Sequence, residues 1–274
     1  MQRGHYRRLF DLSGRVAVVT GGVGLLGREF CAALADHGAL VAVVDLDAAA
    51  TARFAADLTG IFGTKCLGLA CDITDAKAVK DMADRVEKEL GPADILHNNA
   101  QGLGRDLERY FASTETFDLQ TWREVMAVNL DGAFLVAKEI GGRMAERGRG
   151  SIIQTASIYG VVGPDQRIYE GSEYLGRSIN TPAVYSASKA GLIGLTQHLA
   201  AYWGHRGVRV NTLTPGGVSS GQNEAFDRRY SARVPMGRMA VTDDVVGALI
   251  FLASDASSYV NGQNLIVDGG LTAW

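Results

Sequence analysis

A tyrosine and a lysine four residues apart are the side chains in this sequence best suited to chemistry. Tyr185 and Lys189 stand in the segment YSASK, which is expected near the start of a helix. Four residues make about one helical turn, so both side chains project from the same face. A lysine ammonium beside a phenol favours the phenolate and lowers the pKa of the tyrosine, which suits a general base. The pair therefore predicts proton transfer at Tyr185.

A glycine-rich turn further upstream is typical of a site that holds the phosphates of a dinucleotide. Gly22, Gly24 and Gly27 form a G-x-G-x-x-G pattern between an expected strand and an expected helix. Glycines permit a tight turn and a close approach of the backbone to a pyrophosphate, and the helix N-terminus offers free N–H groups. The residues assigned to this dinucleotide site are Gly21, Gly22, Gly24, Leu25, Leu26 and Gly27.

The residue that ends the second expected strand indicates which dinucleotide binds. Asp45 lies 18 residues beyond Gly27. A carboxylate at this place accepts hydrogen bonds from the adenosine ribose and repels a 2′-phosphate. Leu46 follows, where a basic residue would favour NADP. We therefore predict NAD in preference to NADP. Asp72, followed by Ile73, is assigned to the adenine, with capping of the next helix as the alternative.

Apolar runs alternate with helical segments along the whole chain. The expected strands are 16–20, 40–45, 66–71, 93–97, 151–156, 208–213 and 264–267. The expected helices are 25–37, 48–58, 76–90, 119–146, 183–205 and 243–253. Such alternation gives a parallel sheet covered on both faces, and no linker or repeat divides the chain. We expect one Rossmann-type doubly wound α/β domain over 1–274, with a seven-stranded parallel sheet and an N-terminal extension at 1–12.

Two expected loops, 101–118 and 159–182, are longer than is usual for such connections. Each follows a strand, so both should lie over the crevice at the carboxyl ends of the strands, where ligands bind. The inserted segment 159–182 carries charges of both signs and two tyrosines, which favours a polar, hydroxyl-rich substrate. Arginines of both loops would meet a phosphate or carboxylate. The alternative is a solvated loop or a subunit contact. The residues assigned to the substrate are Gln101, Arg105, Tyr159, Arg167, Tyr174 and Arg177.

The composition argues against several classes of protein. There are 27 basic and 30 acidic residues, and this near balance does not favour binding to nucleic acid or to a membrane surface. No apolar run reaches the roughly 18 residues of a membrane span, and the N-terminus lacks a signal-peptide pattern. Three cysteines and five histidines are scattered without the spacing of a metal site. We expect a cytoplasmic protein with reduced thiols and no metal.

Taken in order, these motifs resemble those of the short-chain dehydrogenases/reductases over nearly the whole chain. The matching stretches are TGGVGLLG at 20–27, Asp72, NNA at 98–100, Asn129, Ser157, Tyr185 with Lys189, Asn211, Pro215 with Gly216, and VDGG at 267–270. The resemblance implies hydride transfer between a nicotinamide cofactor and a secondary alcohol or its ketone. Within the family, the chain most resembles oxidoreductases of bacterial sugar and surface-glycan pathways.

The resemblance also implies a role for each matching residue. Tyr185 exchanges the proton with the substrate oxygen, and Ser157 hydrogen-bonds the same oxygen. Lys189 binds the nicotinamide ribose and tunes Tyr185, and Asn129 holds a water that links Lys189 to solvent. The remaining cofactor contacts, at the adenosine ribose and then along the nicotinamide, are Asn99, Ala100, Pro215, Gly216, Val218 and Ser220.

The sequence departs from the family pattern at three places. The usual turn, TGxxxGxG, has glycine where Leu25 stands, and Gln101 replaces the glycine of NNAG. Ser157 lies 28 residues before Tyr185, whereas about 13 is usual, so Ser172 is a rival for the catalytic serine. Ser157 is preferred because it directly follows an expected strand, which fixes its position.

Two other functions stay open at this point. One is a non-catalytic NAD-binding sensor or scaffold, which would not need the serine, tyrosine, lysine and asparagine set. The other is an NAD-dependent sugar-nucleotide epimerase or dehydratase, which is usually longer and has a C-terminal substrate domain. The resemblance further implies a homodimer or homotetramer built on the long helices 119–146 and 183–205, which alternatively only cover the sheet.

Overall fold

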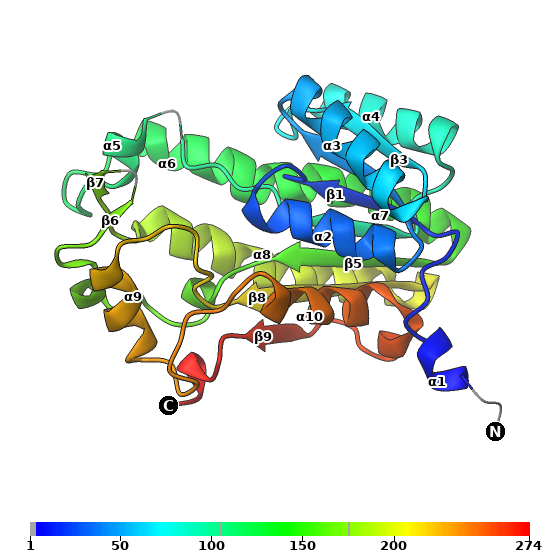
Figure 1. Ribbon diagram of the computed structural model, residues 1–274. Helices are drawn as coiled ribbons and strands as arrows, with labels where there is room; N and C mark the ends of the chain where they lie inside the picture. The colour runs from blue at the N-terminus through cyan, green and yellow to red at the C-terminus, as the bar shows by residue number, and fades with distance from the viewer. Residues whose placement is uncertain (1–3, 105, 175) are drawn as a thin grey trace.

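The computed structural model describes residues 4–104, 106–174 and 176–274. Its centre is a parallel sheet of seven strands in the order β3-β2-β1-β4-β5-β8-β9 (Figure 1). The strands are β1 (Val16–Thr20), β2 (Leu40–Asp45), β3 (Cys66–Ala70), β4 (Ile95–Asn98), β5 (Gly150–Thr155), β8 (Val208–Pro215) and β9 (Asn264–Val267). The predicted fold is confirmed, and the predicted strand ends differ by no more than two residues.

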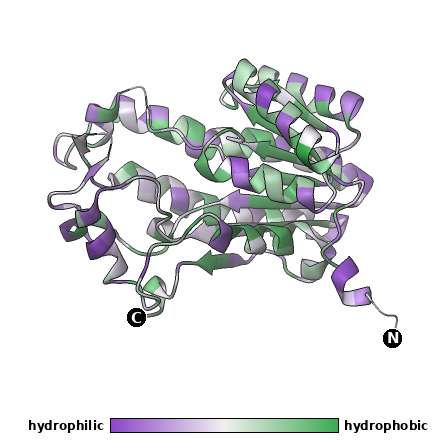
Figure 2. Ribbon diagram, viewed as in Figure 1, coloured by the Kyte–Doolittle hydropathy of each residue, from purple (hydrophilic) through white to green (hydrophobic). Residues whose placement is uncertain are grey.

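Helices cover both faces of this sheet, which explains why β1 and β2 are apolar over most of their length. Every residue of β1 is buried, and β2 is buried except at its two ends. One face packs on α4 (Ala76–Glu89), α7 (Ala133–Arg147) and α8 (Ala183–Trp203). The other packs on α2 (Leu25–Asp36), α3 (Ala48–Phe62) and α10 (Asp243–Ala253). Figure 2 shows the strands mostly in the hydrophobic colour, whereas α9 is largely hydrophilic.

The predicted helix over 119–146 contains a wider turn. It consists of α6 (Leu119–Met126), the π-helical segment η1 (Ala127–Gly132) and α7. Such π segments often occur at functional sites because they shift side chains around the helix axis. Here the segment carries Asn129, which is buried.

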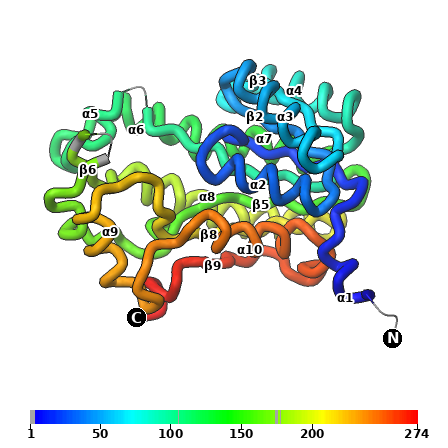
Figure 3. The backbone as a smooth tube through the Cα atoms, in the orientation of Figure 1, coloured from blue at the N-terminus to red at the C-terminus, as the bar shows by residue number. Residues whose placement is uncertain are grey.

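The two long loops fold into short elements at the carboxyl ends of the strands. The first contains α5 (Leu107–Tyr110), and the second contains η2 (Ile158–Gly160), η3 (Gln166–Tyr169), β6 (Glu173–Tyr174) and β7 (Arg177–Ser178). Ile168, Tyr169 and Ile179 of the insertion pack with Phe226 and Tyr230 of α9 (Glu224–Ser231). The alternative of a merely solvated loop is therefore wrong for these residues. Figure 3 traces both loops to the same end of the molecule, beside α9.

The remaining short helices lie near the termini and after α8. They are α1 (His5–Arg8), η4 (Gly204–Arg206), η5 (Asp255–Ser257) and η6 (Leu271–Ala273). Within the described ranges, no helix combines the length and apolar character that a membrane crossing requires. Nor does the described part of the chain bring together three or more histidine, cysteine, aspartate or glutamate residues in a way that would hold a metal ion.

Candidate active site

The glycine-rich turn between β1 and α2 explains how the sequence tolerates its departure from the family pattern. Gly21 has a φ of +66°, which favours glycine, and a Cβ on Gly27 would lie 2.0 Å from the carbonyl oxygen of Gly21. Gly24 is the N-cap of α2, and Leu25 is only the first, exposed residue of that helix. Glycine is therefore required at positions 21 and 27 but not at position 25.

The turn borders a cleft that collects nearly all residues predicted to bind the adenosine and pyrophosphate. The Asp45 carboxylate is held beside it by the backbone N–H groups of Val23, at 3.2 Å, and Leu46, at 2.8 Å. Gly22 is the exception, because it is buried and packs against Val43 behind the turn. The predicted residues that line this cleft are Gly21, Gly24, Leu25, Leu26, Gly27, Asp45, Leu46, Asp72, Ile73, Asn99 and Ala100.

The two roles considered for Asp72 can now be separated. The side chain of Asp75, not that of Asp72, caps α4 by accepting from the N–H groups of Lys77 and Ala78. Asp72 accepts hydrogen bonds from the hydroxyl and the backbone N–H of Thr74, which hold its pKa below the usual range. Asp72 is therefore an ionised carboxylate on the wall of the cleft, and the capping alternative is wrong.

A threonine that the sequence did not single out ties the ends of β1 and β4 together. The hydroxyl oxygen of Thr20 accepts from the N–H groups of Asn99, at 3.1 Å, and Ala100, at 3.2 Å. The Asn99 side chain donates in return to the carbonyls of Thr20 and Gly21. These bonds hold the turn and the NNA segment next to each other, and both line the same cleft.

The catalytic candidates meet at the end of β5. The side chains of Ser157 and Tyr185 are hydrogen-bonded to each other, and both line a cavity that adjoins the dinucleotide cleft. Ser157 also caps the short helix η2, because its hydroxyl accepts from the N–H of Tyr159. The rival Ser172 is buried, and its hydroxyl donates to the carbonyl of Ile168 at 2.9 Å. The geometry therefore favours Ser157 over Ser172.

The electrostatics of the tyrosine and lysine differ from the sequence prediction. Burial raises the pKa of Tyr185, and the hydrogen bond with Ser157 opposes this shift. Lys189 is itself buried, and desolvation lowers its pKa to about 8. Its Nζ lies 5.7 Å from the centre of the Tyr185 ring and donates to the carbonyl of Thr155. The prediction that the pKa of Tyr185 is lowered is wrong for the protein by itself, because the effect of burial is larger than that of the hydrogen bond with Ser157.

Asn129 is the fourth predicted catalytic residue; it is buried and does not itself line the cavity. Its Oδ1 accepts from the N–H of Gly102 at 2.8 Å, and its Nδ2 lies 3.4 Å from the hydroxyl of Ser188. Asn129 therefore connects the first long loop to the turn of α8 between Tyr185 and Lys189. Its place in a proton relay stays a prediction.

The cavity beside Ser157 and Tyr185 has a volume of about 380 Å³. Pro215, Gly216, Val218 and Ser220, predicted to lie along the nicotinamide, all line it. Four residues, Leu26, Asn99, Gln101 and Leu103, are common to this cavity and the dinucleotide cleft. The two spaces thus run into each other, as an extended dinucleotide with its reactive ring near Tyr185 requires.

Only part of the predicted substrate set lies at this cavity. Gln101 and Tyr159 line it. Arg167 does not line it; this side chain is 83% exposed and pairs with Asp165 at 2.7 Å, so the structure gives no support to its predicted contact with the substrate. Arg105 and the side chains of Tyr174 and Arg177 lie outside the described residues.

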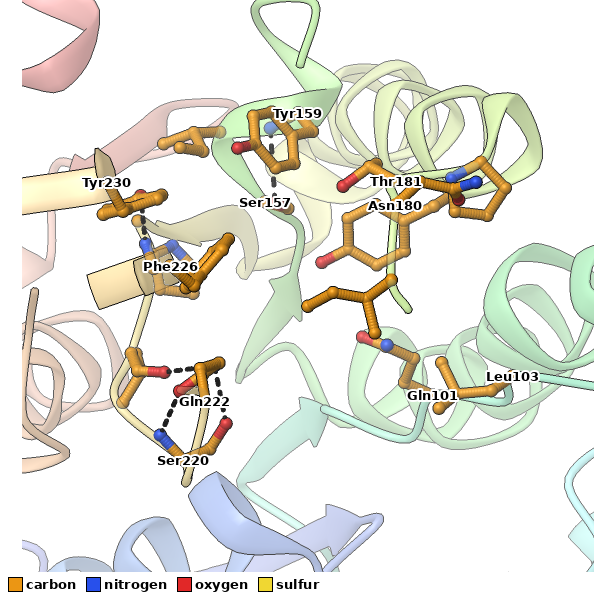
Figure 4. A pocket seen from close by; sticks show the side chains of 18 of the residues that line it. Gln101, Leu103, Ser157, Tyr159, Asn180, Thr181, Ser220, Gln222, Phe226 and Tyr230 are labelled. Atoms are coloured by element: carbon orange, nitrogen blue, oxygen red, sulfur yellow. Dashed lines mark hydrogen bonds between the residues drawn. The ribbon is translucent and has the colours of Figure 1, made fainter. Parts of the chain in front are cut away.

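Several residues that line the cavity were not predicted from the sequence, because most of them belong to short elements that carry no motif. Figure 4 shows Asn180 and Thr181 at one side of the cavity and Phe226 and Tyr230 at the other. Among the described lining residues none carries an ionisable acid, lysine, arginine or histidine side chain. The unforeseen lining residues with polar side chains are Tyr110, Thr155, Tyr169, Asn180, Thr181, Gln222 and Tyr230.

Comparison with known proteins agrees with this geometry. A family model described as enoyl-(acyl carrier protein) reductase matches residues 24–272. The chain belongs to the short-chain dehydrogenases/reductases. This dehydrogenase is 40% identical over 268 residues to D-threitol dehydrogenase of Mycolicibacterium smegmatis, covering 96% of this chain and 95% of the relative. It is 37% identical over 278 residues to galactitol 2-dehydrogenase (L-tagatose-forming) of Cereibacter sphaeroides, covering 98% and 99%.

A solved structure shares the whole fold. The gluconate 5-dehydrogenase of Burkholderia cenocepacia, in complex with NADP and tartrate, superposes with a TM-score of 0.86 at 33% identity, covering 98% of this chain and all of that one. A short-chain dehydrogenase of Leptospira borgpetersenii with bound NAD⁺ gives 0.83 at 32% identity, covering 99% and 97%. The predicted family is thereby confirmed, and this chain is an oxidoreductase that acts on CH–OH groups.

Proposed function

We propose that this dehydrogenase oxidises a secondary hydroxyl of a neutral, polyhydroxylated substrate with NAD, or reduces the corresponding ketone. The observation that carries the proposal is the chemistry of the cavity beside Ser157 and Tyr185. Its described polar side chains are hydroxyls and amides, without a charged group. Hydroxyls and amides pair with the hydroxyls of a polyol, whereas a carboxylate or phosphate is normally met by arginine or lysine.

The relatives support the same class of substrate. The names of the threitol and galactitol dehydrogenases denote neutral polyols, whereas the name of the gluconate 5-dehydrogenase denotes a sugar acid. Because no described residue that lines the cavity is charged, the cavity favours the first kind. The sequence also suggested that arginines of the two loops bind a phosphate or carboxylate of the substrate. Arg167 does not support this, because it is paired with Asp165.

The residues at the cavity supply the proton chemistry. A nicotinamide cofactor bound beside these residues would supply the acceptor or donor of the hydride. In oxidation, Tyr185 takes the proton of the substrate hydroxyl as the C–H hydride leaves, and in reduction it returns that proton to the carbonyl oxygen. Ser157 hydrogen-bonds the same oxygen and holds it beside Tyr185. Lys189 would hold the nicotinamide ribose, and Asn129 would connect Lys189 to solvent.

The preference for NAD rests on Asp45 and Leu46. The carboxylate of Asp45 is fixed at the cleft by two backbone N–H groups, where it would bind ribose hydroxyls and repel a 2′-phosphate. Leu46 offers no positive charge to a phosphate. These features support NAD even though the Burkholderia relative was solved with NADP.

The test is a steady-state comparison of substrates with each cofactor. Threitol and galactitol would be measured against gluconate and sugar phosphates, with NAD and with NADP, by the formation of reduced cofactor. We expect the highest kcat/KM for a neutral polyol with NAD. Faster oxidation of the acids would contradict the neutral class, and binding without turnover would favour the sensor. Product formation without net reduction of cofactor would favour an epimerase or dehydratase.

The assembly and the location of the protein are further proposals. A homodimer or homotetramer follows from the family resemblance, and light scattering after size-exclusion chromatography tests it. A cytoplasmic location follows from the composition alone, and fractionation of cells tests it.

A further inference from the structure

Asn180 joins the two long loops above the catalytic cavity. Its Nδ2 donates to the carbonyl of Phe111 at 2.8 Å and lies 3.4 Å from the carbonyl of Ala112. These contacts fix the orientation of the amide, because turning it over would set Oδ1 against two carbonyl oxygens. Asn180 therefore presents an acceptor, Oδ1, whose direction is set by the backbone of the other loop.

The Oδ1 atom is buried and receives no hydrogen bond from any described protein group. The nearby hydroxyls are engaged elsewhere, since Thr181 and Tyr169 bond to each other at 2.5 Å and Tyr169 also contacts Tyr159 at 3.3 Å. An unpaired buried acceptor is unfavourable, so a built site normally supplies a donor. Asn180 lines the catalytic cavity, and the donor can therefore come from what binds there (Figure 4).

We propose that Asn180 accepts a hydrogen bond from a substrate hydroxyl other than the one that is oxidised, and that this bond selects polyhydroxylated substrates. The inference rests on the proposed polyol dehydrogenase function. The reacting oxygen becomes a carbonyl, which needs donors, and Ser157 and Tyr185 provide them. Oδ1 of Asn180 is only an acceptor, so its partner must be a hydroxyl that persists in both alcohol and ketone.

The same acceptor disfavours other ligands. A carboxylate or phosphate oxygen facing Oδ1 would bring two acceptors together without a proton between them. A simple secondary alcohol would leave Oδ1 unpaired, and sites built to bind a substrate hydroxyl discriminate strongly against analogues that lack it. Asn180 thus accounts for selectivity by hydrogen bonding in a cavity whose described lining residues carry no charge.

The test compares Asn180→Ala with a matched control. Gln166→Ala removes the same kind of bond, because Gln166 Nε2 donates to the backbone carbonyl of Thr181, and Gln166 does not line the cavity. For each protein, kcat/KM would be measured with the best polyol of the panel and with its monodeoxy analogues. We expect wild type to disfavour one analogue by about 10- to 100-fold relative to the polyol. In Asn180→Ala that preference should vanish for this analogue alone, while Gln166→Ala keeps it.

Each outcome bears on a distinct claim. An equal loss of kcat/KM for all substrates in Asn180→Ala would give Asn180 a merely structural role and overturn the inference. Equal use of every deoxy analogue by wild type would also overturn it, without any need for the variant to fold. No oxidation of any polyol by wild type would instead contradict the proposed function itself. Titration with NADH, monitored by fluorescence, would verify that each variant still binds cofactor.

Discussion

The ammonium group of Lys189 donates a hydrogen bond to the backbone carbonyl of Thr155, with Nζ and O 3.0 Å apart. Thr155 ends β5, two residues before Ser157, so one strand end holds both the serine and the lysine of the proposed catalytic group. The lysine is 1% exposed, and desolvation lowers its pKa to about 8. A hydrogen bond to one carbonyl compensates only partly for the lost hydration of a buried ammonium. The buried charge of Lys189 therefore destabilises the folded protein.

Replacing Lys189 should therefore make the protein more stable while abolishing its catalysis. The pKa of about 8 in the folded chain lies below the usual lysine value of 10.5, so the folded chain binds fewer protons than the unfolded chain between these limits. The destabilisation of the folded chain by the buried charge of Lys189 is then fully present below pH 8 and disappears as the pH rises. Lys189→Met should raise the free energy of unfolding by about 1–3 kcal/mol near neutral pH, and the gain should shrink by about 2 kcal/mol near pH 10.

Urea unfolding of wild type and variant across this range checks the prediction. Lys65→Met is the matched control, since Lys65 also donates to a backbone carbonyl, that of Glu89, but is exposed. A gain in stability that does not change with pH would show that the buried charge is not its cause.

Removing the phenolic hydroxyl of Tyr185 should stop turnover without loss of cofactor binding. Tyr185→Phe keeps the ring but removes the group that exchanges the proton, so kcat should fall by about 10²- to 10⁴-fold. Tyr110→Phe, which alters another tyrosine of the cavity wall, should stay within about 10-fold of wild type because only binding contacts change. Steady-state rates and NADH titrations measure both effects, and an active Tyr185→Phe enzyme would eliminate the assigned mechanism.

The hydrogen bond between Ser157 and Tyr185 predicts a displaced pH profile. Burial raises the pKa of Tyr185, and the hydrogen bond with Ser157 partly opposes this rise. The variant Ser157→Ala should therefore raise the pKa of Tyr185 further. Oxidation needs the deprotonated tyrosine, and the midpoint of the rise in rate with pH should therefore move upward, together with a lower maximal rate. Ser172→Ala should leave the midpoint unchanged, because its hydroxyl bonds to Ile168 away from the cavity. A shift in the Ser172 variant instead would reverse the choice of serine.

The sequence predicted the sheet well, and it singled out Ser157 and Tyr185, which the structure brings together at one cavity, because both depend on local patterns. Strands buried on both faces must be apolar throughout, and this makes runs such as 16–20 and 40–45 readable. Ser157, Tyr185 and the glycine turn occur at strand ends or helix starts, where the fold fixes their positions.

The insertion could not be predicted in the same way because its conformation depends on contacts distant in sequence. Asn180 is positioned by carbonyls of Phe111 and Ala112, some seventy residues earlier, and no motif marks that contact. Arg167 has the charge expected of a phosphate ligand, but the turn at Asp165 directs it to a carboxylate. Charge is visible in a sequence, whereas the direction of a side chain on an irregular loop is not.

The choice between NAD and NADP should respond to two residues at the end of β2. Asp45 accepts from the N–H groups of Val23 and Leu46, so Asp45→Asn retains an acceptor for the turn while removing the negative charge. Combined with Leu46→Arg, it should shift the ratio of kcat/KM for NADP over NAD upward by about 10- to 100-fold. Asp47→Asn is the control, because Asp47 caps α3 nearby but does not line the cleft. Steady-state kinetics with both cofactors measure the ratio. An unchanged ratio in the double variant, with normal folding, would mean that Asp45 does not face the ribose, and the preference for NAD would then have to arise elsewhere along the cleft.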